Sequence, residues 1–394
     1  MNWFQRVSNL LNVIDNWMNF SYFDAIDFIK TREDLDNILN GNVQLSPLTN
    51  IDQYNYSGLQ PLHYAIKSKN SLAIDWLLSH GNVLVNSLTE IQNWNSAHCA
   101  VRVDDSDTLI KLIQAGVDLN SFDSYRLTPL AYAKSDLNVE SWIQYLEFNP
   151  NPINFNIRLG PNRRTYFHYF SQDSTELLLD YVIKMNIEGI NAVDIKGTTP
   201  LMLAAESGQI ESLSKLLSNG AKLDILDEKG RSALHMAAES GHSKVCQLLI
   251  NNSDSILVDQ TIDADDFTEY FDSSVESDNA QVQVQEQEQE QELLSIQDNK
   301  DLTPLMLAVL YGHTETVRVL ASKENSKYLD LKQRQSGDTA LHLAVSMNSA
   351  EIVSILLEAG AYPDPFNNSG KKPIDLSAKD SEIFDLLVES VVVV

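Results

Sequence analysis

Few residues in this chain have the side chains that acid–base, nucleophilic or metal chemistry usually requires. The sequence holds eight histidines and two cysteines, Cys99 and Cys246, in 394 residues. A serine or cysteine nucleophile needs a base close by, and zinc is usually bound through short pairs such as Cys-x₂-Cys or His-x₃-His. Neither pair occurs in the sequence. The question of a catalytic site therefore depends on what the histidines do.

Five of the eight histidines occupy one position of a repeated motif. The motif is Thr-Pro-Leu-His-x-Ala or a variant of it, with clear copies beginning at Thr199, Ser232, Thr303 and Thr339. Its fourth position, which we call the histidine slot, recurs every 33 to 37 residues apart from one step of 71. A regular period of this length is typical of a repeat array. The residues at the slot are His63, His98, Ala131, His168, Met202, His235, Met306, His342 and Asp375.

The residue types of the motif suit two packed helices. Proline fits the first turn of a helix, because its missing N–H has no partner to lose there. Small alanines such as Ala204 and Ala237 let neighbouring helices approach closely. A second apolar helix ends in Leu-Leu-x-x-Gly, as at Gly220 and Gly360, where glycine can adopt the left-handed conformation. One such unit cannot bury its own apolar face, so it requires neighbours.

The period and the motif resemble those of the ankyrin repeat family, whose unit is a β-turn finger followed by two antiparallel helices. The resemblance covers roughly residues 52 to 394. It implies an all-α solenoid of helix-turn-helix units with β-turn fingers and a helical cap at each end. It also gives the other histidines structural places, since His242 and His313 follow a glycine between helices and His80 precedes one that ends a helix. We therefore expect no catalytic residues, no metal site, no cofactor and no enzymatic activity.

The motif and the composition divide the chain into four segments. The N-terminal segment has apolar residues at helical spacing from Phe4 to Met18, which predicts either a cap on the first repeat or a partner-docking helix. Four valines end the sequence at Val394, and a PDZ-like domain could bind them. The expected segments are a helical cap over 1–51, repeats one to six over 52–259, an acidic insertion over 260–295, and repeats seven and eight with a closing repeat over 296–394.

The step of 71 residues from His235 to Met306 holds about 38 residues more than the period requires. Residues 260–292 carry eleven Asp or Glu and no Lys or Arg, and they end in a Gln/Glu run. This composition cannot bury enough apolar surface to offset chain entropy, so we expect a mobile acidic loop. Two alternatives remain. One is a helical spur formed by the Gln/Glu run, and the other is a recognition segment anchored by Phe267, Tyr270 and Phe271.

The charge of the chain argues against two classes of partner. Lys and Arg number 28 against 55 Asp and Glu, which gives a net charge of −27. Nucleic acid or anionic lipid would require a basic face. No apolar run approaches the ~18 residues of a membrane span, and the first residues lack the pattern of a signal peptide. We expect a monomeric, cytoplasmic protein that binds a protein partner and neither nucleic acid nor membrane.

The fingers and first helices line the concave face of such a solenoid, which is the usual recognition surface. The fingers of repeats one to four are rich in Tyr, Trp and Arg, the types enriched at interface hot spots. Lys67 and Arg102 add positive charge near the ends of first helices. We predict that an acidic or mixed-charge protein segment docks there, the alternative being that the aromatic side chains only pack finger against finger. The predicted partner-binding residues are Tyr54, Tyr56, Lys67, Trp94, Arg102, Tyr125, Arg126, Arg163 and Arg164.

The sequence shows no second recognisable domain beside the repeats. The chain is therefore similar to stand-alone ankyrin scaffolds, and its degenerate, Asn- and Ile-rich repeats are similar to ankyrin proteins that intracellular bacteria deliver into host cells. Three roles stay open at this point. They are a host-directed adaptor secreted into the host cytosol to bind a eukaryotic protein, an endogenous cytosolic scaffold, and an inhibitor that covers the active site of another protein.

Overall fold

The computed structural model describes residues 59–79, 84–133, 143, 153–155, 157–172, 175–185, 187–259, 293–379 and 381–393. The predicted N-terminal cap, Tyr54, Tyr56, His80 and the acidic stretch 260–292 lie outside these residues. The chain forms two compact units, which are considered separately below. One comprises the described residues up to Tyr169 together with 175–185, and the other comprises 170–172 and the residues from Ile187 onward.

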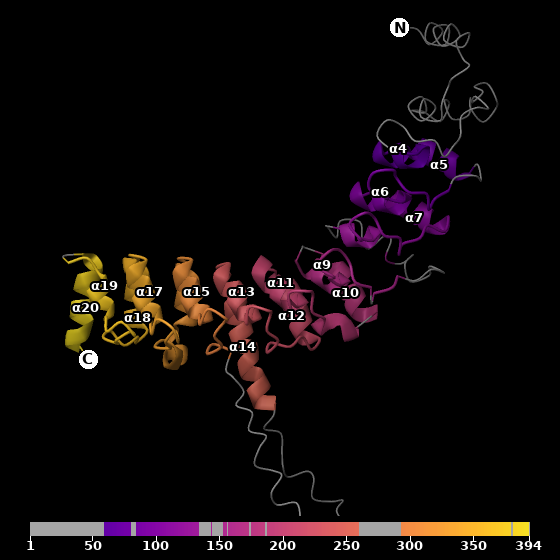
Figure 1. The fold of residues 1–394 in the computed structure, drawn as a ribbon. Coiled ribbons are helices and arrows are strands. Elements are labelled where there is room, and N and C mark those ends of the chain that lie inside the picture. Colours follow the sequence, from indigo (N-terminus) through magenta and orange to yellow (C-terminus); the bar gives the residue numbers. More distant parts are fainter. Residues whose placement is uncertain are drawn as a thin grey trace, which may run out of the picture. The chain divides into compact units, whose positions relative to one another are not determined.

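The first unit is a series of short helices joined by turns (Figure 1). Its helix pairs are α4 with α5 and α6 with α7, and α6 packs against both α4 and the 3-10 turn η2 of the third repeat. The third repeat departs from the expected α-helix, because Ala133 adopts extended backbone and ends η2 after one turn. The elements are α4 Pro61–Lys67, α5 Ser71–Ser79, α6 Ser96–Arg102, α7 Ser106–Gln114, η2 Pro129–Tyr132, α9 Tyr166–Gln172 and α10 Glu176–Met185. Of α9, only the residues up to Tyr169 belong to this unit.

The second unit stacks its first helices in one row and its second helices in another (Figure 1). In the first row α13 packs against α11 and α15, and α17 packs against α15 and α19. In the second row α14 packs against α12 and α16, and α18 against α16 and α20. The elements are η3 Ile187–Asn191, α11 Pro200–Ser207, α12 Ile210–Ser218, α13 Ala233–Glu239, α14 Ser243–Asp259, α15 Pro304–Leu310, α16 Thr314–Leu320, η4 Lys323–Tyr328, α17 Ala340–Ser346, α18 Ala350–Glu358, α19 Pro373–Leu376 and α20 Glu382–Val393.

The motif residues start the first helices as their chemistry predicts. The hydroxyl oxygens of Thr199 and Thr303 accept the backbone N–H of the residue three positions on, each at 3.2 Å. Proline follows both threonines at the first helical position. Gly208 ends α11 in the left-handed conformation with φ of 72°. Because the cap, the proline and the glycine all agree, the helix boundaries follow from the sequence.

The histidine slot ties each first helix to its own start and to the next repeat. His235 shows the pattern: its Nδ1 accepts the backbone N–H of Ser232 at 3.2 Å, and its Nε2 donates to the Leu302 carbonyl at 3.2 Å. His98 and His342 bond to the carbonyls of Leu127 and Lys371 in the same way, also at 3.2 Å. The slot histidine therefore links adjacent repeats in these three cases.

His63 departs from this pattern. It is buried in α4, yet neither ring nitrogen has a hydrogen-bond partner among the described residues. The residue at the helix start is Gln60, whose side chain does not cap α4 as a threonine or serine does elsewhere. Burial disfavours the charged imidazolium and lowers the pKa of His63 to about 4.

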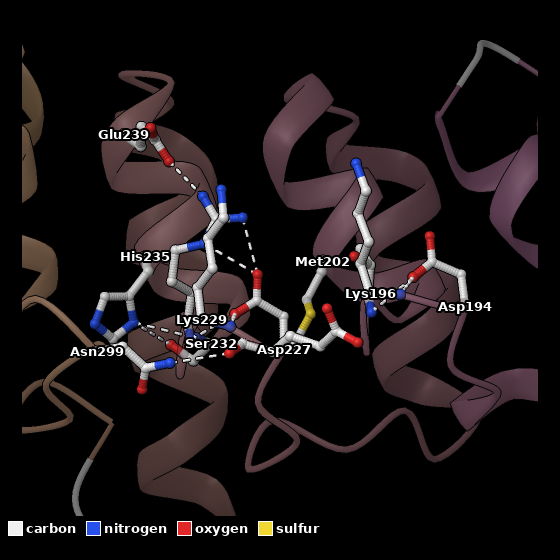
Figure 2. Close-up of polar contacts among 12 residues, drawn as sticks. Asp194, Lys196, Met202, Asp227, Lys229, Ser232, His235, Glu239 and Asn299 are labelled. Atoms are coloured by element: carbon white, nitrogen blue, oxygen red, sulfur yellow. Dashed lines mark hydrogen bonds and ion pairs between the residues drawn. The ribbon is translucent and has the colours of Figure 1, made fainter. Parts of the chain in front are cut away.

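The fingers are held by a buried carboxylate and by bonds to the preceding finger. Asp194 Oδ1 accepts the backbone N–H of Lys196 at 2.8 Å, and Asp227 Oδ1 accepts that of Lys229 at 2.9 Å (Figure 2). Successive fingers are then linked, since the Glu228 N–H donates to the Lys196 carbonyl at 2.9 Å. The fingers therefore form a ladder without a β-sheet in the described part of the second unit.

The stack continues across the acidic insertion. The finger of the seventh repeat bonds to that of the sixth, as the Asn299 N–H donates to the Lys229 carbonyl at 2.8 Å and Asn299 Nδ2 donates to the Glu228 carbonyl at 2.9 Å. The His235 bond to Leu302 adds a third link. The sixth and seventh repeats therefore pack as ordinary neighbours although 33 further residues separate α14 from residue 293.

The all-α solenoid predicted from the sequence is confirmed in both units. Aromatic side chains fill the core of the fourth repeat, where Tyr166, Phe167 and Phe170 are fully buried. Among the helices of the described ranges, none is long and apolar enough to cross a membrane.

Candidate functional site

The clearest cluster of recognition-type side chains lies in the first unit and is organised by one buried carboxylate. Asp123 is 5% exposed and sits in the finger of the third repeat. Its Oδ1 accepts the backbone N–H groups of Tyr125 at 2.9 Å and Leu127 at 2.8 Å. Its Oδ2 accepts Trp94 Nε1–H at 3.2 Å and the Tyr132 hydroxyl at 2.5 Å. One side chain therefore positions the fingers of two repeats and the first turn of η2.

The two aromatic rings bonded to Asp123 support an arginine. Trp94 and Tyr132 meet edge to face, with ring centroids 5.8 Å apart. The guanidinium carbon of Arg102, the last residue of α6, lies 5.8 Å from the Trp94 centroid and 5.5 Å from the Tyr132 centroid. This is within the range of cation–π attraction, which orients an exposed guanidinium. We call Trp94, Arg102, Asp123 and Tyr132 the arginine shelf.

The tip of the third finger presents a second arginine on an aromatic ring. Arg126 has its guanidinium carbon 5.5 Å from the Phe122 centroid, and both side chains are exposed. Tyr125, beside it, is 65% exposed. These side chains are available to a partner, because the bonds that shape the finger use backbone groups of Tyr125 and Leu127.

The fourth finger continues from the third. The Gly160 N–H donates to the Arg126 carbonyl at 2.9 Å, and Leu159 forms a β-bridge with Arg164. Arg163 at the tip is exposed, whereas Arg164 is half-buried. Tyr169 lies beneath this finger, since a Cβ added to Gly160 would meet its hydroxyl at 2.8 Å. Gly160 also has a φ of 64°, so both its backbone conformation and the nearby hydroxyl favour glycine at this position.

The predicted residues thus fall into three groups. Trp94 and Arg102 come together in the arginine shelf. Tyr125 and Arg126 lie at the tip of the third finger, and Arg163 and Arg164 belong to the fourth finger bonded to it. Lys67 is exposed at the end of α4, and Tyr54 and Tyr56 lie outside the described residues. Trp94 is half-buried with its N–H bonded, so packing between fingers accounts for much of its surface.

Asp123, Phe122 and Tyr132 were not among the predicted site residues. A signal for Tyr132 was present, because the position after the histidine slot holds tyrosine in Tyr64, Tyr132 and Tyr169 but an aliphatic residue in Leu203 and Leu307. Asp123 gave no such signal. Aspartate stands at the same place in the later fingers as Asp194, Asp227 and Asp298, and only the structure shows the second use of its carboxylate.

In the second unit, Arg231 is paired with two carboxylates of its own repeat. Arg231 donates to Asp227 Oδ2 at 2.8 Å and to Glu239 Oε2 at 2.8 Å. The Tyr311 hydroxyl donates to Glu239 Oε1 at 2.9 Å and so extends the network to the seventh repeat. These charged groups are already satisfied, in contrast with the exposed arginines of the first unit.

Burial shifts the pKa of several other groups among the described residues. Burial raises the pKa of Cys99 and of Cys246 to about 12, so both are thiols at neutral pH. Burial and the bond to Asp123 raise the pKa of Tyr132 well above its ordinary value. In the ranges that the structure covers, no group of three or more His, Cys, Asp or Glu is arranged to hold a metal ion.

The repeat geometry agrees with a family comparison. The family model for ankyrin repeats in three copies matches residues 137–227, 167–266, 281–367 and 328–392, which together cover more than half of the chain. The chain belongs to the ankyrin repeat family. Ankyrin repeats are protein-interaction modules, so the extended face of fingers and first helices is the expected binding surface.

Individual relatives match this chain over only part of their own length. The chain is 40% identical over 87 residues to Zinc finger CCCH domain-containing protein 29 of Arabidopsis thaliana, covering 21% of this chain and 14% of that protein. It is 38% identical over 80 residues to an ankyrin repeat protein of Fowlpox virus, covering 20% and 22%. It is 28% identical over 316 residues to Transient receptor potential cation channel subfamily A member 1 of Drosophila melanogaster, covering 70% and 23%. The chain therefore matches less than a quarter of the length of each of these proteins.

Proposed function

We propose that this chain is a non-enzymatic protein-interaction scaffold that docks an acidic or mixed-charge segment of a partner protein on repeats one to four. The observation that carries the proposal is the exposed tip of the third finger, where Tyr125 and Arg126 project next to Phe122. Tyr and Arg are the residue types that most often dominate protein interfaces.

The charge of the third and fourth fingers and of the helical turns that follow them supports an acidic partner. The described residues 119–133 and 157–170 contain four arginines, Arg126, Arg158, Arg163 and Arg164, and one acidic residue, Asp123. This excess of positive charge stands in a chain whose net charge is −27. Complementary charge accelerates association and excludes basic partners. The same overall charge disfavours nucleic acid and anionic membranes as ligands.

The cellular role depends on whether the partner protein comes from a host cell or from the same cell as this chain. We propose that the chain is a monomeric, cytosolic adaptor. If its partner is a eukaryotic host protein, the chain is a bacterial effector that is secreted into the host cytosol. The viral and eukaryotic relatives carry their ankyrin repeats in proteins of different kinds. An endogenous scaffold, or an inhibitor that covers the active site of its partner, would use the same surface.

Affinity capture from eukaryotic and bacterial lysates tests the proposal. The intact chain is compared with Tyr125→Ala/Arg126→Ala and with the matched control Ile195→Ala/Lys196→Ala, which truncates exposed residues of the fifth finger. A protein retained by the intact chain and the control but lost from the third-finger variant supports docking on repeats one to four. Equal retention by all three would refute it. An activity assay on the captured protein then separates an inhibitor from an adaptor.

A further inference from the structure

Arg102 combines three properties that an ordinary surface arginine lacks. Its guanidinium is held near the rings of Trp94 and Tyr132, at 5.8 and 5.5 Å from their centroids. The side chain is exposed. It makes no hydrogen bond and no ion pair with the residues that the structure describes, although Arg231, Arg318 and Arg334 all form ion pairs. Its N–H donors therefore face solvent in a fixed orientation.

Asp123 orients the two aromatic rings of the arginine shelf. Both rings that support Arg102 are bonded to Asp123 Oδ2, through Trp94 Nε1 and the Tyr132 hydroxyl. The finger fold itself does not require these bonds. Asp298 holds the seventh finger through Lys300 and Leu302 N–H groups at 2.8 and 2.9 Å, as Asp123 does with Tyr125 and Leu127, without bonding an aromatic side chain.

We propose that Arg102 is a carboxylate-binding anchor, which receives an Asp or Glu side chain of the partner segment, and that Asp123 is the residue that positions it. This inference rests on the proposed scaffold function and names the chemistry of its contact. A planar guanidinium with free donors binds a carboxylate through two parallel hydrogen bonds. Support by two rings reduces the rotamer freedom that an arginine loses on binding, because a preorganised side chain loses less entropy.

The shelf presents one arginine, beside the buried Asp123 that accepts from Trp94 and Tyr132. A phosphate is usually recognised by a cluster of arginines, whereas one planar guanidinium fork matches one carboxylate. We therefore assign a carboxylate rather than a phosphate to Arg102. Arg126, held over Phe122 in the neighbouring finger, provides a second anchor of the same kind for another acidic residue of the segment.

The test uses the full chain and a fluorescein-labelled peptide with the sequence of residues 263–276, which carries six acidic residues and three aromatic ones. Its binding is followed by anisotropy at low and physiological salt. We expect saturable, salt-sensitive binding that Arg102→Gln weakens at least tenfold and that Arg102→Lys weakens less, because lysine keeps the charge but not the fork. Arg318→Gln is the matched control on an exposed arginine of the second unit and should leave the affinity unchanged.

The positioning role of Asp123 is tested with Asp123→Asn against Asp298→Asn. The asparagine oxygen can keep the backbone bonds of either finger, but in Asp123→Asn the amide N–H groups oppose the Trp94 and Tyr132 donors. We expect several-fold weaker peptide binding for Asp123→Asn only. Equal affinities for the two variants would show that Asp123 serves the finger alone and would overturn its positioning role.

Other results would overturn the anchor. They are the absence of saturable binding, equal affinity of the Arg102→Gln variant, and more than tenfold preference for a phosphoserine version of the peptide. If the peptide bound only after deletion of 260–292, the ligand of Arg102 would be the acidic segment of this chain and not an external partner. The lysate capture separates the two proposals: a partner lost from Tyr125→Ala/Arg126→Ala but kept by Arg102→Gln leaves the scaffold function standing and rejects the anchor.

Discussion

The Tyr311 hydroxyl donates a hydrogen bond to Glu239 Oε1 at 2.9 Å, although the two residues are 72 positions apart in the sequence. His313 Nε2 also donates to the Glu239 carbonyl at 2.9 Å. Together with the finger bonds of Asn299 to Lys229 and Glu228, these contacts close the interface between the sixth and seventh repeats. The acidic insertion lies between the bonded partners in sequence but supplies none of these bonds.

Cutting the chain within the insertion should leave the two parts associated. A recognition sequence for a site-specific protease, inserted after Asn279, allows the cut in the purified protein. We expect the cut protein to elute in size-exclusion chromatography at the volume of the intact chain, because the interface is non-covalent and complete. The variant Tyr311→Phe/Asn299→Ala removes the two side-chain bonds of these residues and should dissociate more readily after the cut. Separation of the unmodified cut protein into two peaks at micromolar concentration would contradict the expectation.

Replacing Gln60 by threonine should stabilise the first described repeat. In the eighth repeat Thr339 Oγ1 lies 3.0 Å from His342 Nδ1 and caps α17, whereas among the described residues α4 has no side-chain cap and the His63 ring nitrogens have no hydrogen-bond partner. The Gln60→Thr change should add about 1 kcal/mol to the local stability of α4. Slower hydrogen exchange of the α4 amides measures the effect.

Thr339→Gln is the reciprocal variant and should speed exchange in α17 by a comparable amount. If Gln60→Thr left exchange in α4 unchanged, a missing cap would not be the reason for the unpaired imidazole of His63.

Acidification should weaken the folded chain through its slot histidines. Burial lowers the pKa of His63 and of His235 from 6.5 to about 4. Between these values the unfolded chain binds more protons than the folded chain, so stability is full above pH 6.5 and decreases as the pH falls toward 4. Each histidine contributes at most about 1.4 kcal/mol per pH unit in this window. Urea midpoints at pH 7.5, 6 and 5 measure the decrease, and His63→Gln should show a smaller one than the unmodified protein.

Alanine at Gly337 should destabilise the protein more than alanine at Gly370. Both glycines have positive φ, 72° and 71°, so the backbone strain of an alanine is the same at both, about 1 kcal/mol. A Cβ at Gly337 would also meet the backbone nitrogen of Asn368 at 2.5 Å, where the eighth and ninth fingers touch, whereas Gly370 has open space. We expect a loss of about 2 kcal/mol or more for Gly337→Ala, measured by urea denaturation. Equal losses would mean that the ninth finger can move away.

The sequence predicts the helices of this fold well, because the residues that start and end a helix lie within the same repeat. Thr199, Pro200 and Gly208 define α11 by local chemistry, and the same residue types recur in α15. Features that depend on two repeats at once are less visible. His63 has no ring hydrogen bond among the described residues, in a repeat where Gln60 stands at the capping position. The third repeat forms only a 3-10 turn over Pro129–Tyr132 although Thr128, Pro129 and Leu130 match the motif.

The candidate site could be predicted only in part for the same reason. Exposed finger residues such as Tyr125 and Arg126 follow from their place before the motif. The arginine shelf does not, since Trp94 and Asp123 are 29 residues apart and belong to different fingers. Aspartate in a finger is explained by its backbone bonds alone, and so the sequence gives no reason to assign it a second role.

The length of α14 has a consequence for how ligands can share this protein. With 17 residues it is eight longer than α12, and at 1.5 Å per residue the additional turns carry its end about 12 Å further along the helix axis. Figure 1 shows this end projecting beyond the neighbouring helices of the second unit. The insertion therefore begins at a point beyond the ends of the neighbouring helices. A molecule held by the first residues of the insertion and one held by the adjacent repeats are spaced apart at their attachment points, which favours simultaneous over competitive occupancy.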